Sequence, residues 1–488
     1  MNFVSKDPPN SSSLPVAVIG GGIAGLAAAY QLSRYGRRVI LLESAPRVGG
    51  VIRSERSPEG WLVEAGPNSF QENSRATATF LQELGLAADI TPASGVAKKR
   101  FIVRGGRPCQ APMSPPSLIA TPLLSSRGKL RIFRDLFFSR RSRPADVSVA
   151  AFVSEHFGSE LLDYAFNPLV AGVYAGDPQK LSAQHAFPLL WKVEQSHGSL
   201  IRGLIATARD RKRRGEPKTR LISFRDGLQM LPDALARALP ADCIRLNATL
   251  ETLTPPATPG APWRIGFRTT NSTRADNAES SLQVESCASV ILTVPAHALA
   301  KVVIASDPTT SASSGAPANR PFAELADIAY PAVASMFLGY RREQVAHPLD
   351  GFGMLVPEVE RRQILGVLFS SSLFPQRAPE GHVALTVLVG GTRQPALAHL
   401  PADRLLETIM PDLRELLGVS GEPVFIRHNV SARAIPQYNL GHERFLQVIA
   451  RAEQAFDGLF VGGQVRDGIS VPACLQAGLT LASRAHER

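Results

Sequence analysis

Long apolar runs are absent from this chain of 488 residues. No run of about 18 residues is free of charges and glycine breaks, which argues against a membrane-spanning helix. Residues 1–13 are rich in Ser, Pro and Asn and lack the charged start and apolar core of a signal peptide, so we expect a disordered lead. Cysteine is also scarce, and neither metal-site nor disulfide spacing relates Cys109, Cys243, Cys287 and Cys474. These absences indicate an intracellular protein that needs no metal.

Acidic residues are fewer than basic ones, 42 against 53, and the imbalance is local. The stretch from Lys98 to Arg143 contains twelve basic residues and a single acidic one, Asp135. Such a patch attracts anions, but no nucleic-acid-reading motif accompanies it, so we do not expect a nucleic-acid partner.

The segment LRIFRDLFFSRR lies within this basic stretch. It sets apolar residues at helical spacing among arginines, which is typical of a helix at a membrane interface. An ordinary amphipathic helix with a solvated basic face explains the pattern equally well. The apolar residues are Leu130, Ile132, Phe133, Leu136 and Phe137.

A dinucleotide-binding unit is predicted near the amino-terminal end. A strand at 16–19, a helix at 23–34 and a second strand at 39–42 follow one another, with a GxGxxG turn between the first two. The three glycines permit a tight turn, the approach of a pyrophosphate and close packing of the helix on the sheet, in the order Gly20, Gly22 and Gly25. The helix directs its free amides at the phosphates, and Glu43 is placed to accept the ribose hydroxyls.

The kind of dinucleotide is indicated just downstream. The segment Arg47-Val48-Gly49-Gly50, followed by Val51-Ile52-Arg53-Ser54, resembles the RxGG extension of FAD-dependent amine oxidase-like flavoproteins. Motifs further along, in chain order, are EAGPNSF, NPLVAGVYAGDPQKLS, SFRDGLQMLPDAL, DGFGMLVP, AIPQYNLGH and GLFVGGQVRDGISVPACLQAG. Together they resemble the family of oxygen-dependent protoporphyrinogen oxidases and coproporphyrinogen III oxidases of haem synthesis.

The resemblance implies a fold of α/β and α+β class. It comprises a Rossmann-like FAD-binding domain, a mixed-sheet substrate domain and a helical, membrane-associating domain. The expected FAD-binding parts are residues 14–95, 213–300 with a small meander, and 446–488. The helical, basic part is expected at 96–212 and the substrate-binding part at 301–445.

Local patterns add further expectations. The pattern over 147–162 predicts a helix, and that over 243–250 a strand. Alternating apolar residues at 335–340, 364–369 and 383–389 predict a mostly antiparallel sheet that roofs the substrate cavity. Residues 306–321 are expected to form a polar linker. Two glycines, Gly172 and Gly176, suit a backbone that another group approaches closely, or a packed helix crossing.

The resemblance also implies site residues. Arg100 matches an arginine that pairs with a substrate propionate, and the carbonyl of Gly172 would face the pyrrole N–H groups. The tetrapyrrole rings would be sandwiched by Phe352, Leu355, Leu368 and Leu388. The cofactor would lie against Gly20, Gly21, Gly22, Ile23, Ala24, Gly25, Glu43, Val51, Gly66, Pro67, Asn68, Ser69, Leu250, Gln464, Ile469, Ser470 and Val471.

The implied chemistry needs no side-chain base. We find no Ser/His/Asp, paired-carboxylate or Cys/His arrangement of catalytic type in the sequence. A porphyrinogen methylene bridge can lose hydride to flavin N5, because the cation is delocalised over two pyrroles, and the N–H protons can leave to water. Aromatisation removes six electrons in three flavin cycles, and oxygen is reduced to hydrogen peroxide. The resemblance therefore implies an oxidoreductase acting on CH–CH groups with oxygen as acceptor.

Alternatives remain open at this point. The substrate is expected to be protoporphyrinogen IX, with coproporphyrinogen III as the alternative. An amine oxidase, a carotenoid desaturase-like flavoenzyme or a non-catalytic flavin-bearing assembly protein is the rival class. An aromatic content of 7% argues against the aromatic cage of an amine oxidase. The resemblance further suggests a cytoplasmic, peripheral location at the inner face of the membrane, a homodimer and contact with ferrochelatase.

Overall fold

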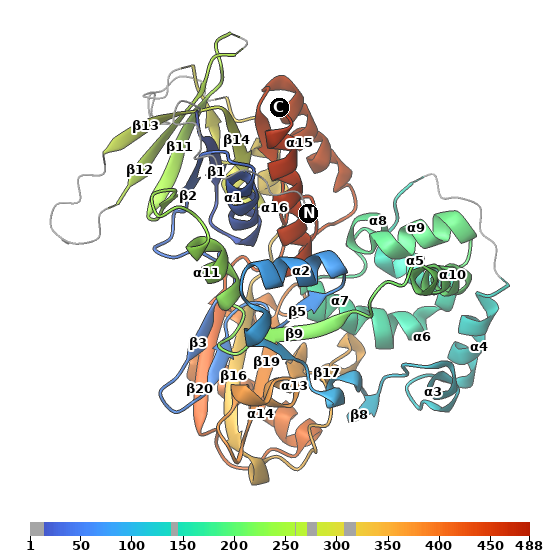
Figure 1. Ribbon diagram of the computed structural model, residues 1–488. Helices are drawn as coiled ribbons and strands as arrows, with labels where there is room; N and C mark the ends of the chain where they lie inside the picture. The colour runs from blue at the N-terminus through green and yellow to red at the C-terminus, as the bar shows by residue number, and fades with distance from the viewer. Residues whose placement is uncertain (1–13, 138–144, 259, 271–280, 307–318) are drawn as a thin grey trace.

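The computed structural model describes residues 14–137, 145–258, 260–270, 281–306 and 319–488. The lead predicted at 1–13 and most of the linker predicted at 306–321 lie outside the described residues. The chain forms three regions, built around a five-stranded sheet, a seven-stranded sheet and a group of helices (Figure 1).

The five-stranded sheet holds the predicted dinucleotide unit and is parallel throughout. Its strands lie in the order β10 (Ile244–Arg245), β2 (Val39–Leu42), β1 (Val16–Ile19), β14 (Ser289–Leu292) and β21 (Leu459–Val461). The side chains of β1, β2 and β14 are buried along their whole lengths, as expected of parallel strands covered on both faces. Strands from the first and last parts of the sequence therefore share one sheet.

Two helices pack on this sheet, α1 (Ile23–Arg34) and α16 (Val471–His486). They contribute to the same apolar core, together with α11 (Met230–Arg237). The helices predicted at 23–34 and in the last part of the chain are confirmed.

An antiparallel meander adjoins this sheet. It runs through β11 (Ala248–Thr254), β12 (Trp263–Thr269) and β13 (Leu282–Cys287), and β11 also pairs with β15 (Val303–Ile304). The single strand predicted at 243–250 is wrong. Asn247 has a φ of 53°, and this left-handed residue separates β10 in the parallel sheet from β11 in the meander.

The seven-stranded sheet lies at the opposite end of the molecule (Figure 1). Its order is β20 (Phe425–Ser431), β16 (Val333–Arg341), β19 (His382–Gly390), β18 (Gly366–Leu368), β17 (Gly353–Leu355), β7 (Phe101–Arg104) and β8 (Arg107–Gln110). All its pairs are antiparallel except β17 with β7, so the mostly antiparallel sheet is confirmed. The helix α14 (Ala402–Leu417) shares its core.

Strands β7 and β8 correct one expectation. Residues 101–110 were placed in the helical part that was predicted at 96–212, but they extend the seven-stranded sheet. Parallel pairing with β17 joins them to residues about 250 positions away, for example Met354 with Phe101. Local sequence carries no signal for such a partner.

The helices form the third region, at the right of Figure 1. They are α3 (Pro115–Ala120), α4 (Ser126–Arg134), α5 (Val149–Phe157), α6 (Ser159–Leu161), the π-helical turn η3 (Leu162–Phe166), α7 (Asn167–Tyr174), α8 (Ala183–Ala186), α9 (Pro188–His197) and α10 (Leu200–Arg213). The helical pattern predicted at 147–162 is confirmed with one break, because Gly158 has a φ of 85° and ends α5 before α6 begins. None of the helices in the described ranges is long and apolar enough to cross a membrane.

A buried ionic cluster connects these helices. His156 on α5 lies between two carboxylates, with Nδ1 2.5 Å from Asp135 Oδ1 and Nε2 2.8 Å from Glu194 Oε1. Asp135 Oδ2 accepts hydrogen bonds of 2.9 Å from Ser199 Oγ and from the amide of Ile201. The single acid of the basic stretch is therefore an internal group rather than a surface charge.

A small sheet lies between the three regions. It consists of β5 (Phe70–Glu72), β9 (Arg220–Phe224) and β6 (Ile90–Pro92), with the helix α2 (Arg75–Glu83) beside it (Figure 1). A two-stranded sheet, β3 (Ser54–Arg56) with β4 (Leu62–Glu64), precedes it along the chain.

Candidate active site

The glycine-rich turn leaves room for a phosphate group. Gly20 has a φ of 107°, which lets the chain turn sharply from β1 into α1. A methyl group added at Gly25 would lie 1.8 Å from the carbonyl oxygen of Gly20, so α1 can approach the turn only with glycine there. A methyl group at Gly22 would meet nothing within 4 Å. Gly20 and Gly25 thus serve the turn and the packing of α1. The space above Gly22, in contrast, is open and lies at the amino end of a helix, where anions bind.

Glu43 lies directly against this turn. Its Oε2 accepts a hydrogen bond of 2.7 Å from the amide of Gly21, and its Oε1 accepts one of 2.7 Å from Ala45. The amide of Ala248 donates to the carbonyl of Glu43 over 2.9 Å, which brings β11, and with it Leu250, to the same end of the sheet. Glu43 and Leu250, both predicted to contact the cofactor, therefore lie at the same end of the parallel sheet as the glycine-rich turn.

A second turn approaches the first. The amide of Gly49 donates to the carbonyl of Gly21 over 2.8 Å. A methyl group on Gly66 would lie 2.0 Å from the carbonyl oxygen of Val51, while the side chain of Val51 is 53% exposed. The RxGG segment and the turn at 66–69 are thus packed together, and both border the open space above the glycine-rich turn.

The last helix completes this site. A methyl group on Gly478 would lie 2.1 Å from the carbonyl oxygen of Ala24, so α16 crosses α1 at close range. Ser470 caps α16, because its Oγ accepts a hydrogen bond of 3.3 Å from the amide of Ala473. The amino end of α16 carries the partial positive charge of that helix, and the resemblance places it at the flavin. The open glycine turn and the amino end of α1 offer N–H donors, and the carboxylate of Glu43 offers an acceptor, which together fit a dinucleotide.

The predicted ring-binding leucines lie on one face of the seven-stranded sheet. Leu355 is opposite Gly366, and Gly366 is opposite Leu388. Leu368 lies two residues after Gly366, so it points to the same side. All three leucines are half-exposed, whereas most of their strand neighbours are buried. The sheet therefore presents a small apolar surface that is only partly covered.

The helix α7 borders this surface. A methyl group on Gly172 would lie 2.6 Å from Leu355 Cδ2, and one on Gly176 would lie 2.3 Å from Gln437 Oε1. The close approach predicted at these two glycines is confirmed, and the approaching groups are side chains from outside the helical region.

Arg100 and Phe352 lie together at the edge of the same sheet. The guanidinium carbon of Arg100 is 5.1 Å from the centre of the Phe352 ring, a cation–π distance. The amide of Phe352 donates to the carbonyl of Lys99 over 2.8 Å. Arg100 is exposed, so its charge is available to a ligand that rests on the aromatic ring.

Other polar residues at this site were missed in the sequence. Tyr438 donates its hydroxyl hydrogen to the carbonyl of Gln464, and Gln437 Nε2 donates to the carbonyl of Tyr174 over 2.7 Å. Burial raises the pKa of the Tyr438 phenol, so it remains a donor. The AIPQYNLGH motif therefore ties α7 to a segment expected at the flavin. In the sequence, only the adjacent polar residues Gln437 and Tyr438 within this motif indicated that it makes such hydrogen bonds.

A family model for flavin-containing amine oxidoreductases matches residues 23–486. The chain belongs to this family. It is therefore a flavin-dependent oxidoreductase, and the prediction that its cofactor is FAD is confirmed. The open glycine turn and the two helix amino ends are where the chain's own residues would hold that cofactor.

Individual relatives agree with this family membership. Protoporphyrinogen oxidase 2, chloroplastic/mitochondrial, of Arabidopsis thaliana is 33% identical over 96% of this chain and 92% of that protein. Coproporphyrinogen III oxidase of Bacillus subtilis (strain 168) is 25% identical over 96% of this chain and 97% of that protein. The resemblance stated from the sequence motifs is confirmed.

The fold has close counterparts among solved structures. A putative protoporphyrinogen oxidase from Exiguobacterium sp. 255-15 superposes with a TM-score of 0.77 at 22% identity, covering 98% of this chain and 100% of that one. The mixed α/β flavoprotein fold is confirmed. Within the described ranges, no group of three or more His, Cys, Asp or Glu residues could hold a metal ion. The individual roles of the site residues stay predictions.

Proposed function

We propose that this flavoenzyme is an oxygen-dependent protoporphyrinogen IX oxidase, which converts protoporphyrinogen IX into protoporphyrin IX in haem biosynthesis and releases hydrogen peroxide. The observation that carries the proposal is the half-exposed apolar face of Leu355, Leu368 and Leu388, together with the exposed charge of Arg100, which contacts Phe352 where the neighbouring strands β7 and β17 begin. A flat apolar ring system with carboxylates at its rim matches this surface in shape and charge.

Each residue has a task that follows from its position. The leucines would pack against the tetrapyrrole and exclude water, and Arg100 would pair with a propionate through its guanidinium. The carbonyl of Gly172 would accept hydrogen bonds from pyrrole N–H groups. Bound FAD supplies the hydride acceptor and the route to oxygen. Since the protons leave from pyrrole nitrogens to water, the chain needs to orient the substrate rather than to supply a base.

Porphyrin fluorescence and oxygen uptake test the proposal together. Purified holoprotein given protoporphyrinogen IX should form the fluorescent porphyrin and consume about three molecules of oxygen for each one, as expected for a six-electron oxidation. A diamine is the matched substrate for the rival amine oxidase. A yellow protein that oxidises the diamine and leaves the porphyrinogen unchanged would refute the proposal.

Coproporphyrinogen III is the second candidate substrate. It carries four propionates instead of two, and the excess of basic over acidic residues in the stretch that contains Arg100 favours a more highly charged ligand. Rates measured side by side with the two porphyrinogens distinguish the candidates, because a ratio of kcat/KM above one for coproporphyrinogen III assigns the enzyme to that reaction.

Replacement of Arg100 by Ala should raise the KM for porphyrinogen about tenfold or more, because a charge-assisted hydrogen bond of about 1.5–3 kcal/mol is lost. FAD content should stay unchanged, since Arg100 lies on the seven-stranded sheet. Lys98→Ala is the matched control, an exposed neighbouring cation. Steady-state kinetics and the flavin-to-protein absorbance ratio check the result, and an unchanged KM in Arg100→Ala would remove its role as carboxylate anchor.

The helical region is proposed to associate with a membrane surface. Leu130 is 70% exposed and Phe137 is 86% exposed, and α4 also carries Arg127, Lys129, Arg131 and Arg134. The helix α4 ends at Arg134, so Phe137 follows it rather than forming its last turn, and Ile132 is buried. Apolar side chains projecting among cations suit an anionic lipid interface.

Liposome co-sedimentation tests this surface. Phe133→Ser with Phe137→Ser should reduce binding to vesicles that contain anionic lipid about fivefold or more, since the apolar area available for insertion falls. Val424→Ser with Ile426→Ser removes exposed apolar residues at the start of β20 and just before it and should leave binding unchanged. Equal binding of both double variants would exclude α4 as the contact.

We also propose that the domains have the limits given from the sequence. The same proposal includes a cytoplasmic location at the inner face of the membrane, a homodimer and contact with ferrochelatase.

A further inference from the structure

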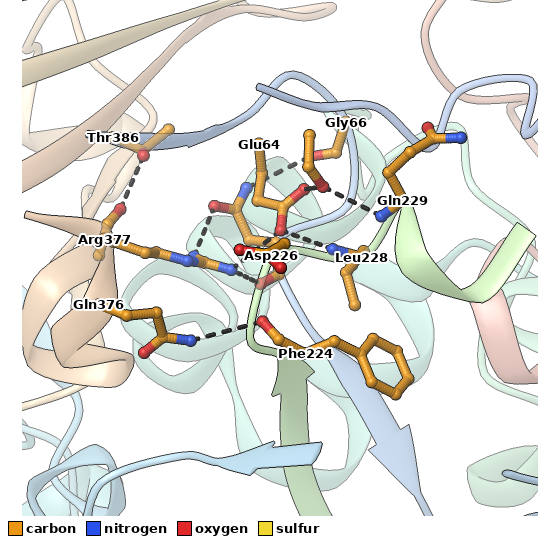
Figure 2. A network of polar contacts seen from close by, with 12 residues as sticks. Glu64, Gly66, Phe224, Asp226, Leu228, Gln229, Gln376, Arg377 and Thr386 are labelled. Atoms are coloured by element: carbon orange, nitrogen blue, oxygen red, sulfur yellow. Dashed lines mark hydrogen bonds and ion pairs between the residues drawn. The ribbon is translucent and has the colours of Figure 1, made fainter. Parts of the chain in front are cut away.

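Arg377 is a buried arginine that the proposed reaction does not use. It follows α13 (Ser370–Leu373) in the short 3₁₀ turn η7 (Pro375–Arg377), just before β19. Its side chain is 1% exposed. It extends out of the seven-stranded region and ends against Glu64 and Asn68, in the segment 64–69 that is expected to contact the flavin; Figure 2 labels Arg377, Glu64 and Gly66 of this contact. A full positive charge is therefore buried where the seven-stranded sheet meets the segment that follows β4.

The guanidinium binds two residues of that turn. Its NH1 group lies 3.2 Å from Asn68 Oδ1, and its NH2 group donates to the main-chain carbonyl of Asn68. NH2 also lies 3.5 Å from Glu64 Oε1 in an ion pair. The ring of Phe374 covers the guanidinium at 4.6 Å. Arg377 therefore holds Asn68 by both its side chain and its backbone.

The carboxylate of Glu64, which pairs with Arg377, is itself held in place by hydrogen bonds. Its Oε2 accepts a hydrogen bond of 2.6 Å from Ser54 Oγ, and its Oε1 accepts one of 2.9 Å from the amide of Leu228. Ser54 Oγ accepts in turn from the amide of Gln229 over 3.0 Å. Figure 2 shows these bonds as one network. The carboxylate is thus immobilised by β3 and by the segment that leads into α11.

Both groups of the pair carry a desolvation cost. Burial lowers the pKa of Arg377 to about 10 and raises the pKa of Glu64, while each partner's charge acts in the opposite direction. Arg377 therefore remains protonated at neutral pH. A buried ion pair of this kind seldom adds net stability compared with apolar residues of the same size. Its hydrogen bonds to Asn68 point to a role in geometry.

The guanidinium also determines which way the Asn68 amide faces. Arginine has donors only, so the atom of Asn68 that meets NH1 is the oxygen. The amide nitrogen then lies on the other side, where it donates to the carbonyl of Gly66 over 3.3 Å. Residues 65–69 are half-exposed, between the buried residues Glu64 and Phe70. One N–H of the Asn68 amide is thus bound to Gly66, and its second N–H, rather than its oxygen, is left to meet a bound ligand.

We propose that Arg377 is a positioning residue for the flavin: it reaches from the substrate-side sheet to hold Asn68 in one orientation, so that the turn presents a fixed N–H donor toward the cofactor. The proposal deepens the flavin-binding role of the turn. It rests on the proposed function only in taking the seven-stranded sheet as the part that binds the porphyrinogen. The two sheets are thereby coupled, because the residue that sets the turn belongs to the sheet that would bind substrate.

The test removes both charges together. In the variant Glu64→Gln with Arg377→Met, no unpaired charge is left buried, so the protein should keep its thermal midpoint to within a few degrees. The dissociation constant of FAD, measured by titrating apoprotein and following flavin fluorescence, should rise about tenfold. Arg362→Met is the matched control, because Arg362 pairs with Asp412 and Glu415 inside the seven-stranded region and should leave the constant unchanged.

A mutant cycle with Asn68→Ala identifies the route of the effect. If Arg377 acts through Asn68, adding the charge-free pair to Asn68→Ala should raise the dissociation constant no further. Additive increases would overturn the proposal, and so would wild-type affinity in the charge-free variant.

Arg377→Lys provides a second arm if the charge-free variant does not fold. Lysine keeps a positive charge near Glu64 but lacks the planar fork, so the same loss of affinity is expected, and wild-type affinity would overturn the proposal. These affinities are measured without porphyrinogen. A protein that fails to oxidise porphyrinogens would therefore refute the proposed function and leave this result intact.

Discussion

Gly22→Val is expected to yield a protein that folds and does not bind FAD. Gly22 has a φ of −70° and a ψ of 177°, a conformation that valine adopts readily. A Cβ atom there would meet no atom of another part of the protein within 4 Å, so we expect the apoprotein to lose little stability. The same space is where a pyrophosphate would approach the amino end of α1, so the affinity for FAD should fall about 100-fold or more, or ~2.7 kcal/mol.

Titration of apoprotein with FAD measures this loss, and thermal unfolding of the apoprotein measures the folding. Gly25→Ala is the contrasting variant, because its methyl group would lie 1.8 Å from a backbone carbonyl and should lower the thermal midpoint of the apoprotein itself. If Gly22→Val bound FAD as tightly as the unchanged chain, the cofactor could not lie over this turn.

His156→Leu should destabilise the helical region severely. The imidazole is fully buried between Asp135 and Glu194, and its removal leaves two carboxylates buried without their shared partner. Loss of one member of such a buried group costs about 3–5 kcal/mol. Denaturant unfolding monitored by circular dichroism checks the loss, with the exposed His399→Leu as control. A loss below about 1 kcal/mol would show that the carboxylates are neutral or solvated.

The same cluster predicts how stability depends on pH. Burial alone would lower the pKa of His156, but its hydrogen bonds to Asp135 and Glu194 outweigh burial and raise that pKa above its usual value. The stabilisation is therefore complete below about pH 6.5 and is lost as the pH rises through the folded-state pKa. For Asp135, burial is likewise outweighed by its hydrogen bonds, and its pKa is lowered, so its contribution is lost only in acid. The difference in unfolding free energy between the unchanged chain and His156→Leu should shrink at alkaline pH.

Local patterns were sufficient for the dinucleotide unit. A four-residue apolar strand, a glycine turn and a helix are adjacent in the sequence, and the close contact of Gly25 is with the carbonyl oxygen of Gly20 in the same short segment. The position of Glu43 against Gly21 follows from the same adjacency. These features could be predicted because the interacting residues are close along the chain.

The remaining parts depend on partners far along the chain. Arg377 meets Asn68 across 309 positions, and nothing in the sequence near either residue indicates the other. The common face of Leu355 and Leu388 depends on the register of both strands against Gly366, and a shift by one residue would turn those leucines to the other side. Resemblance to a family suggested these leucines, whereas their shared face had to come from the three-dimensional arrangement.

The parallel sheet also has a consequence for how the protein is made. Its central strand β1 ends at residue 19, but β14 begins only at residue 289 and β21 at residue 459. A ribosome adding roughly 5–20 residues per second needs roughly 20–90 s to travel between the first and last of these strands. Until β14 has been made, the apolar edge of β1 that pairs with it is exposed on the nascent chain, where it can aggregate, and the outer edge of β14 then stays open until β21 follows. Efficient production should therefore depend on chaperones that shield this edge until the last helix emerges.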